Sequence, residues 1–180
     1  MREEILAQKR SSEWTAETLK NVKGLQPFID ETMRPAPTAG GHMRLSPSSV
    51  ELTSQRSGKS YVLPAGTMFV YTQAQVMNDP SVVSNAHEFD LNRFSRECKR
   101  DRRGKTDAVL DSPMNDVFSS GPRQCIGSRL AKVEIRLVIA ELVARYHVGF
   151  AIESLPPKYT IWNALLSRPD PVPKFVFTSV

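Results

Sequence analysis

The ten residues from Phe118 to Gly127 constrain this chain more than any other segment. They read Phe-Ser-Ser-Gly-Pro-Arg-Gln-Cys-Ile-Gly and lead into an apolar run, Arg129–Tyr146, that predicts a helix. Gly121 and Gly127 allow tight turns and a close approach of the backbone to a bound group, where a Cβ would clash. Cys125 is therefore expected in a bent loop just ahead of a helix N-terminus, where free N–H groups and the helix dipole favour a thiolate.

This loop meets all five fixed positions of the pattern F-x-x-G-x-R-x-C-x-G. A thiolate that ligates haem iron needs such a setting, because neighbouring donors must moderate its charge while it feeds electron density to the metal. Phe118 can pack beside the sulfur, and Arg123 can pair with a haem propionate. The loop therefore predicts Cys125 as the axial ligand of haem iron, with Phe118, Gly121, Arg123 and Gly127 as cofactor-binding residues. The alternative, a buried structural cysteine beside a glycine turn, suits an isolated cysteine better than this whole pattern.

The composition is that of one ordinary globular domain. The 180 residues are 40% hydrophobic and 24% charged, and the net charge is +5. Mild positive charge does not by itself indicate nucleic acid. Two cysteines, Cys98 and Cys125, are too few for a disulfide framework. The charged N-terminus predicts no signal peptide, and no run nears the roughly 20 apolar residues of a membrane helix.

Periodicity and turn residues predict an α+β fold that is mainly α. We expect a single domain over 1–180 with six segments. In chain order they are helices over 1–34, β hairpins over 44–75, a loop region over 76–117 with a short helix near Ser81, the cysteine loop 118–127, a helix over 128–147, and terminal strands over 148–180. The helix over 128–147 is apolar on almost every side, which predicts that it is buried.

Three further segments accompany the cysteine loop in a fixed order. Glu31 and Arg34, spaced i and i+3, lie on one helix face and can pair. Leu63–Thr67 forms a proline-x-glycine-threonine turn, and Phe89–Phe94 contains an arginine-phenylalanine dipeptide at Arg93. With the loop, these segments resemble the C-terminal portion of the cytochrome P-450 family, from its K helix to its C-terminus. The spacing and loop style resemble fungal members of that family.

The resemblance implies a structural triad and a second contact to haem. In the family, a buried glutamate shared between two arginines braces the region of the cysteine loop. Glu31, Arg34 and Arg93 match those positions, although an ordinary helix salt bridge with an unrelated Arg93 is the alternative. Arg44 lies where the family often places a propionate-binding arginine, and His42 is a competing candidate. For both, a solvated side chain is the alternative.

The same resemblance implies haem b (iron protoporphyrin IX) bound through Cys125 and the insertion of one oxygen atom of O2 into a small organic substrate, for example in a secondary-metabolite pathway. The resemblance covers nearly the whole chain but only about the C-terminal third of a typical member. The distal helix that delivers protons to bound oxygen has no counterpart, so no catalytic residue is identifiable. Two hypotheses follow: a monooxygenase completed by a distal half, or a truncated, catalytically inactive family member with no turnover of its own.

The family also implies a redox partner, an NADPH-dependent reductase that docks on the basic proximal face through opposite charge. A charged segment could contribute to this face, with a solvated loop as the alternative. Its basic residues are Arg96, Lys99, Arg100, Arg102, Arg103 and Lys105. No nucleic acid is expected, because no aromatic residues interleave with these charges. The localisation is not readable from the chain, but full-length eukaryotic members are usually anchored in the endoplasmic-reticulum membrane.

Overall fold

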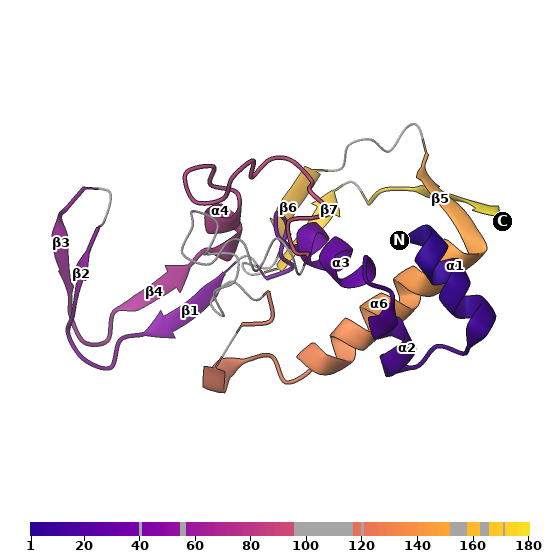
Figure 1. Ribbon diagram of the computed structural model, residues 1–180. Coiled ribbons are helices and arrows are strands. Elements are labelled where there is room, and N and C mark those ends of the chain that lie inside the picture. Colours follow the sequence, from indigo (N-terminus) through magenta and orange to yellow (C-terminus); the bar gives the residue numbers. More distant parts are fainter. Residues whose placement is uncertain are drawn as a thin grey trace.

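The computed structural model of this protein describes residues 1–39, 41–54, 57–95, 117–119, 121–151, 158–162, 166–170 and 172–180. Within these ranges, helices gather at one end of an elongated molecule and a β hairpin extends from the other end (Figure 1). None of the described helices is both long and apolar enough to span a membrane.

Three short helices open the chain: α1 (Arg2–Ser11), α2 (Ala16–Asn21) and α3 (Leu25–Met33). Thr15 caps α2 reciprocally with Thr18. The Thr18 N–H donates to the Thr15 hydroxyl at 3.1 Å, and the Thr15 N–H donates to the Thr18 hydroxyl at 2.7 Å. This capping box satisfies two donors that a helix start would leave without partners. All three helices lie within the range 1–34 in which helices were expected.

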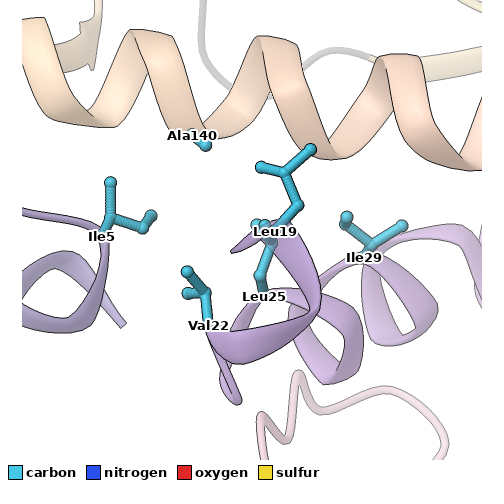
Figure 2. Packing of buried hydrophobic residues seen from close by; sticks show 6 residues of the cluster. All are labelled: Ile5, Leu19, Val22, Leu25, Ile29 and Ala140. Atoms are coloured by element: carbon cyan, nitrogen blue, oxygen red, sulfur yellow. The ribbon is translucent and has the colours of Figure 1, made fainter. Parts of the chain in front are cut away.

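The main core lies between these helices and the long helix α6 (Ser128–Arg145). Figure 2 shows the small side chain of Ala140 on α6 facing larger apolar side chains from the N-terminal helices. The buried residues of this cluster are Ile5, Leu19, Val22, Leu25, Ile29 and Ala140. Because alanine adds little bulk, α6 can approach the N-terminal helices closely at this position.

The prediction that the 128–147 helix is buried is wrong for this chain. Of the residues in α6, only Ser128 and Ala140 are buried, whereas Leu130 is 63% and Val138 is 55% exposed. The N-terminal helices pack against one side of α6, and the described residues leave an apolar part of its surface uncovered. The helix also ends at Arg145, because Tyr146 enters a strand.

The strands form four two-stranded antiparallel sheets in the described part of the chain. The pairs are β1 (His42–Leu45) with β4 (Met68–Tyr71), β2 (Val50–Thr53) with β3 (Ser60–Leu63), β5 (Tyr146–Phe150) with β8 (Phe175–Ser179), and β6 (Lys158–Trp162) with β7 (Leu166–Asp170). The β2–β3 hairpin is therefore inserted between the two strands of the β1–β4 pair. Two-stranded sheets are marginal unless another layer packs on them.

The prediction of a short helix near Ser81 is also wrong. A short helix, α4 (Gln73–Met77), lies earlier, and turns follow it. The Asp79 carboxylate accepts hydrogen bonds from the Ser81 N–H at 2.8 Å and from the Ser81 hydroxyl at 2.6 Å. This local side-chain bond offers the backbone an alternative to a helix. Met77, Val83 and Ala86 then form a second small core.

Leu25→Ala should lower the free energy of unfolding by about 2–5 kcal/mol, because it opens a cavity at a side chain that is fully buried. Leu130→Ala is the matched control. It makes the same substitution at a side chain that is 63% exposed, so the expected change is within about 0.5 kcal/mol. Urea unfolding followed by circular dichroism measures both, and equal losses would contradict this placement of the core.

Glu141 joins α6 to α1 through an ion pair with Lys9. Lys9 Nζ donates to both carboxylate oxygens, at 2.6 and 2.7 Å, and Arg145 Nε donates to one of them at 2.6 Å. The hydrogen bonds from Lys9 and then Arg145 lower the pKa of Glu141 to about 2, from an ordinary value of 4.5. A carboxyl pKa lowered by folding stabilises the protein above its unfolded value and loses this effect as the pH falls toward the folded value.

Glu141→Gln should therefore destabilise the protein at neutral pH by less than about 1 kcal/mol, since the pair is solvent-accessible. The difference from the unsubstituted chain should shrink between pH 4.5 and about 2. Urea unfolding at a series of pH values tests this. A difference that is constant across that interval would show that the ion pair is not its source.

Candidate functional site

One carboxylate, that of Glu31 on α3, is shared between two arginines in the interior of the molecule. Glu31 is 0% exposed, and Arg34 and Arg93 are each 4% exposed. Arg34 donates to both Glu31 oxygens, from Nε at 2.9 Å and from Nη2 at 3.1 Å. Arg93, which is 62 residues further along the chain, donates from Nε to the same carboxylate at 3.1 Å. The structure thus brings together the three residues predicted as a triad.

The remaining guanidinium donors of this triad bind the backbone from the last residue of α4 to Glu88. Arg34 reaches carbonyls at 2.7 and 3.3 Å, and Arg93 reaches carbonyls at 2.6, 3.1 and 3.2 Å. The acceptors are the carbonyl oxygens of Met77, Ser84, Asn85 and Glu88. The Asp90 N–H also donates to Glu31 at 3.0 Å. Sequence reasoning missed these partners, because a backbone carbonyl has no residue signature.

The cysteine loop is closed by its own backbone. The Cys125 N–H donates to the Phe118 carbonyl at 2.9 Å, and the Gln124 N–H donates to the Gly121 carbonyl at 3.0 Å. Gly121 has a φ of +70°, which a glycine adopts without strain. Ser119 has a φ of +63°, an uncommon conformation for a residue with a side chain. Sequence reasoning did not single out Ser119.

The Cys125 thiol is exposed and free, and it lies just ahead of the first turn of α6. The Ser128 N–H donates to the Cys125 carbonyl at 3.2 Å, which joins the loop to the helix. A Cβ at Gly127 would stand 3.9 Å from Sγ, in van der Waals contact, so the glycine keeps that side of the sulfur open. The predicted free thiol of Cys98 lies outside the described residues.

Two other predicted loop residues occupy the edges of the loop. The Phe118 ring has the ammonium group of Lys132, on α6, at 5.1 Å from its centroid, within the range of a cation–π contact. Arg123 lies in the short 3₁₀ turn Gly121–Arg123 and is exposed. The backbone bond from the Cys125 N–H joins Phe118 to Cys125, and Arg123 lies two residues before Cys125 in the same loop.

Strand β1 brings a further cation to this loop. Arg44 Nη2 lies 3.5 Å from the hydroxyl of Ser119. His42, two residues earlier on the same face of the strand, stacks on Tyr71 with ring centroids 6.5 Å apart. Its Nε2 is buried and has no hydrogen-bond partner within the part of the chain that the structure describes. A buried nitrogen of this kind suits an acceptor group supplied by a bound molecule.

The basic segment considered for a redox partner, Arg96 to Lys105, lies outside the described residues. The Glu31 triad organises the backbone from Met77 to Glu88, and the candidate site consists of the cysteine loop and the β1 strand, which the contact between Arg44 and Ser119 joins. In it an open thiol, a cationic edge and an unpaired histidine nitrogen come from well-separated segments of the sequence.

Comparisons with known proteins identify a single family. Residues 1–175 match the family model described as cytochrome P-450. The chain is 29% identical over its whole length to "Probable cytochrome P-450 12c1, mitochondrial" of Drosophila melanogaster, of which it covers 33%. Over 93% of its length it is 30% identical to "Cytochrome P-450 monooxygenase CYP512U6" of Ganoderma lucidum, again covering 33%. The chain thus spans about a third of the length of these relatives.

A solved structure shares the fold. "Retinoic acid bound cyanobacterial CYP120A1" aligns with a TM-score of 0.77 over 99% of this chain and 38% of its own, at 22% sequence identity. The predicted family and the predicted α+β fold are both confirmed. The relatives include insect and fungal proteins, so the fungal character stays a prediction. Membrane anchoring in the endoplasmic reticulum also stays a prediction. The name of the Drosophila relative assigns that relative to mitochondria.

Glu31→Gln should lower the free energy of unfolding by about 3–5 kcal/mol, because it leaves two buried guanidiniums without their counter-charge. Glu141→Gln is the matched control, since it makes the same change in an accessible ion pair. Urea unfolding at pH 7 measures both. A loss at Glu31 no larger than that at Glu141 would show that the triad does not hold the segment after α4.

Proposed function

Since the chain belongs to the cytochrome P-450 family of haem monooxygenases, we propose that it binds haem b through Cys125 and forms the haem-proximal part of such an enzyme. The observation that carries the proposal is the exposed thiol of Cys125. It lies in a loop closed by its own N–H bond to Phe118, directly before α6. Gly127 leaves one side of the sulfur uncovered, since a Cβ there would contact Sγ at 3.9 Å.

The donor set of the site fits this cofactor. One soft thiolate suits iron, and the two haem propionates are carboxylates that require cations or N–H donors. Arg44 and Arg123 supply the cations, and His42 offers a buried nitrogen that lacks a partner among the described residues. When bound, thiolate-ligated haem supplies the oxygen-activating chemistry of the family.

Each of the proposed site residues has a distinct role. Cys125 holds the iron, and Phe118 packs beside the sulfur and restricts access of water. Gly121 and Gly127 let the backbone approach the porphyrin. The Glu31 triad is a positioning device, because it joins α3 to the segment after α4 through buried charge-assisted bonds. We assign 118–127 as the haem loop and the following helix as the one beneath the proximal face.

The reaction of the completed enzyme would insert one oxygen atom of O2 into a small organic substrate, with electrons from an NADPH-dependent reductase. A role in a secondary-metabolite pathway belongs to this proposal. None of the residues discussed supplies directed proton delivery to oxygen, so turnover requires a distal half.

Cys125→Ser should abolish the signature of thiolate ligation. Haem is added to the purified chain, reduced, and exposed to carbon monoxide, and the Soret band is recorded. The unsubstituted chain should show the red-shifted band of thiolate-ligated haem, and the Cys125→Ser chain should not. Cys98→Ser is the matched control and should keep the red-shifted band. Identical spectra for all three chains would refute iron ligation by Cys125.

A further inference from the structure

The Phe118 ring and the ammonium group of Lys132 connect the cysteine loop to α6. Lys132 Nζ lies 5.1 Å from the ring centroid, within the range in which an aromatic face attracts a cation. Phe118 and Lys132 are both half-buried, whereas Arg129, three residues earlier on the same helix, is exposed. The ring therefore holds the Lys132 charge at a defined and partly desolvated position.

The place of Lys132 on α6 explains how its charge reaches the loop. The helix begins at Ser128, so Lys132 lies one turn inside it. Long side chains on a helix lean back toward its N-terminus, which here is the end next to Cys125. The Cys125 N–H donates to the Phe118 carbonyl at 2.9 Å, so the ring belongs to the residue that closes the loop around the cysteine.

The charged side chains around the loop all have one sign. Residues 117–133 include Arg123, Arg129 and Lys132 but no aspartate or glutamate. The helix dipole favours acidic residues at a helix N-terminus, yet the first turn of α6 has none. Cations at this end do not stabilise the helix itself. They suit a negative group at the helix start, and the thiolate of the proposed function is such a group.

A fixed cation near a metal ligand acts on the electron affinity of the metal. One-electron reduction of ferric to ferrous iron adds one negative charge to the site, so a nearby positive charge stabilises the reduced state. The effect is larger where water is partly excluded, and it is screened at an exposed position. Of the two cations near the start of α6, the half-buried Lys132 should therefore act more strongly than the exposed Arg129.

We propose that Lys132, positioned by the Phe118 ring, raises the reduction potential of iron held by Cys125 and so favours acceptance of an electron. The NADPH-dependent reductase of the proposed function supplies this electron, and ferric iron becomes ferrous without a bond being formed or broken. Lys132 acts through its charge, and Phe118 is its positioning residue. The inference rests on the proposed function, since it concerns the iron assigned there to Cys125.

The test is a redox titration of the full chain loaded with haem, with dithionite as the reductant, mediator dyes, and the Soret band as the signal. Lys132→Met removes the charge and keeps an apolar stem. At a fixed solution potential, the ratio of ferrous to ferric iron should fall by about five- to tenfold. Lys132→Arg should stay within about twofold of the unsubstituted chain, because a guanidinium also binds an aromatic face.

Two controls separate this role from a general loss of charge. Arg129→Met removes the same charge at an exposed position and should change the ratio less than about twofold. In a Phe118→Leu chain, which lacks the ring, Lys132→Met should also change it less than about twofold. Circular dichroism shows that each chain is folded. Equal effects of Lys132→Met and Arg129→Met, or a full effect without the ring, would overturn the inference.

The contact itself is measured in the haem-free chain. Urea unfolding of the unsubstituted chain, Phe118→Leu, Lys132→Met and the double variant forms a double-mutant cycle. The two substitutions should be non-additive by about two- to fivefold in the unfolding equilibrium constant, the size of a cation–π contact near a surface. Additive effects would overturn the inference, because the ring would then not hold the ammonium group.

Failure of this inference and failure of the proposed function give different results. A red-shifted Soret band in the unsubstituted chain, with a potential that Lys132→Met leaves unchanged, would refute this inference alone. A non-additive cycle without any red-shifted band would refute iron ligation by Cys125, and the inference would then fail with it.

Discussion

The carboxylate of Glu31, buried between two guanidiniums, is the interaction on which the arrangement of this chain depends most. It connects α3 to Arg93, and the other donors of both arginines bind four backbone carbonyls between Met77, the last residue of α4, and Glu88. Burying three charges is costly unless every donor and lone pair is satisfied. Here the backbone of the following segment supplies the missing partners, so the triad and that segment can form only together.

The cysteine loop depends on shorter-range forces. Its closure uses backbone bonds within ten residues, a glycine with positive φ, and the start of α6. It can therefore keep its shape although the Cys125 side chain is exposed. The triad and the loop represent two ways of positioning one site, the first by buried charge over long sequence distances and the second by local backbone geometry.

The buried apolar core of the described part of the chain is small. Nine apolar residues are buried in the described part of the chain, while apolar side chains on α6 and on the β5–β8 ribbon remain exposed. Because hydrophobic stabilisation scales with the apolar area removed from water, much of the stabilisation encoded in these residues is not realised by this third of the fold alone.

The sequence by itself determined what depends on neighbours in the chain. It predicted helices over 1–34 and β hairpins over 44–75, and the spacing of its motifs identified the family. The prediction of a short helix near Ser81 is wrong because the Asp79 carboxylate accepts the Ser81 N–H and so competes with helical backbone bonds. Only the tertiary structure decided which carbonyls satisfy the arginines and which side of α6 is covered. These contacts join residues far apart in sequence, and apolar periodicity indicates that a face seeks burial without identifying what will bury it.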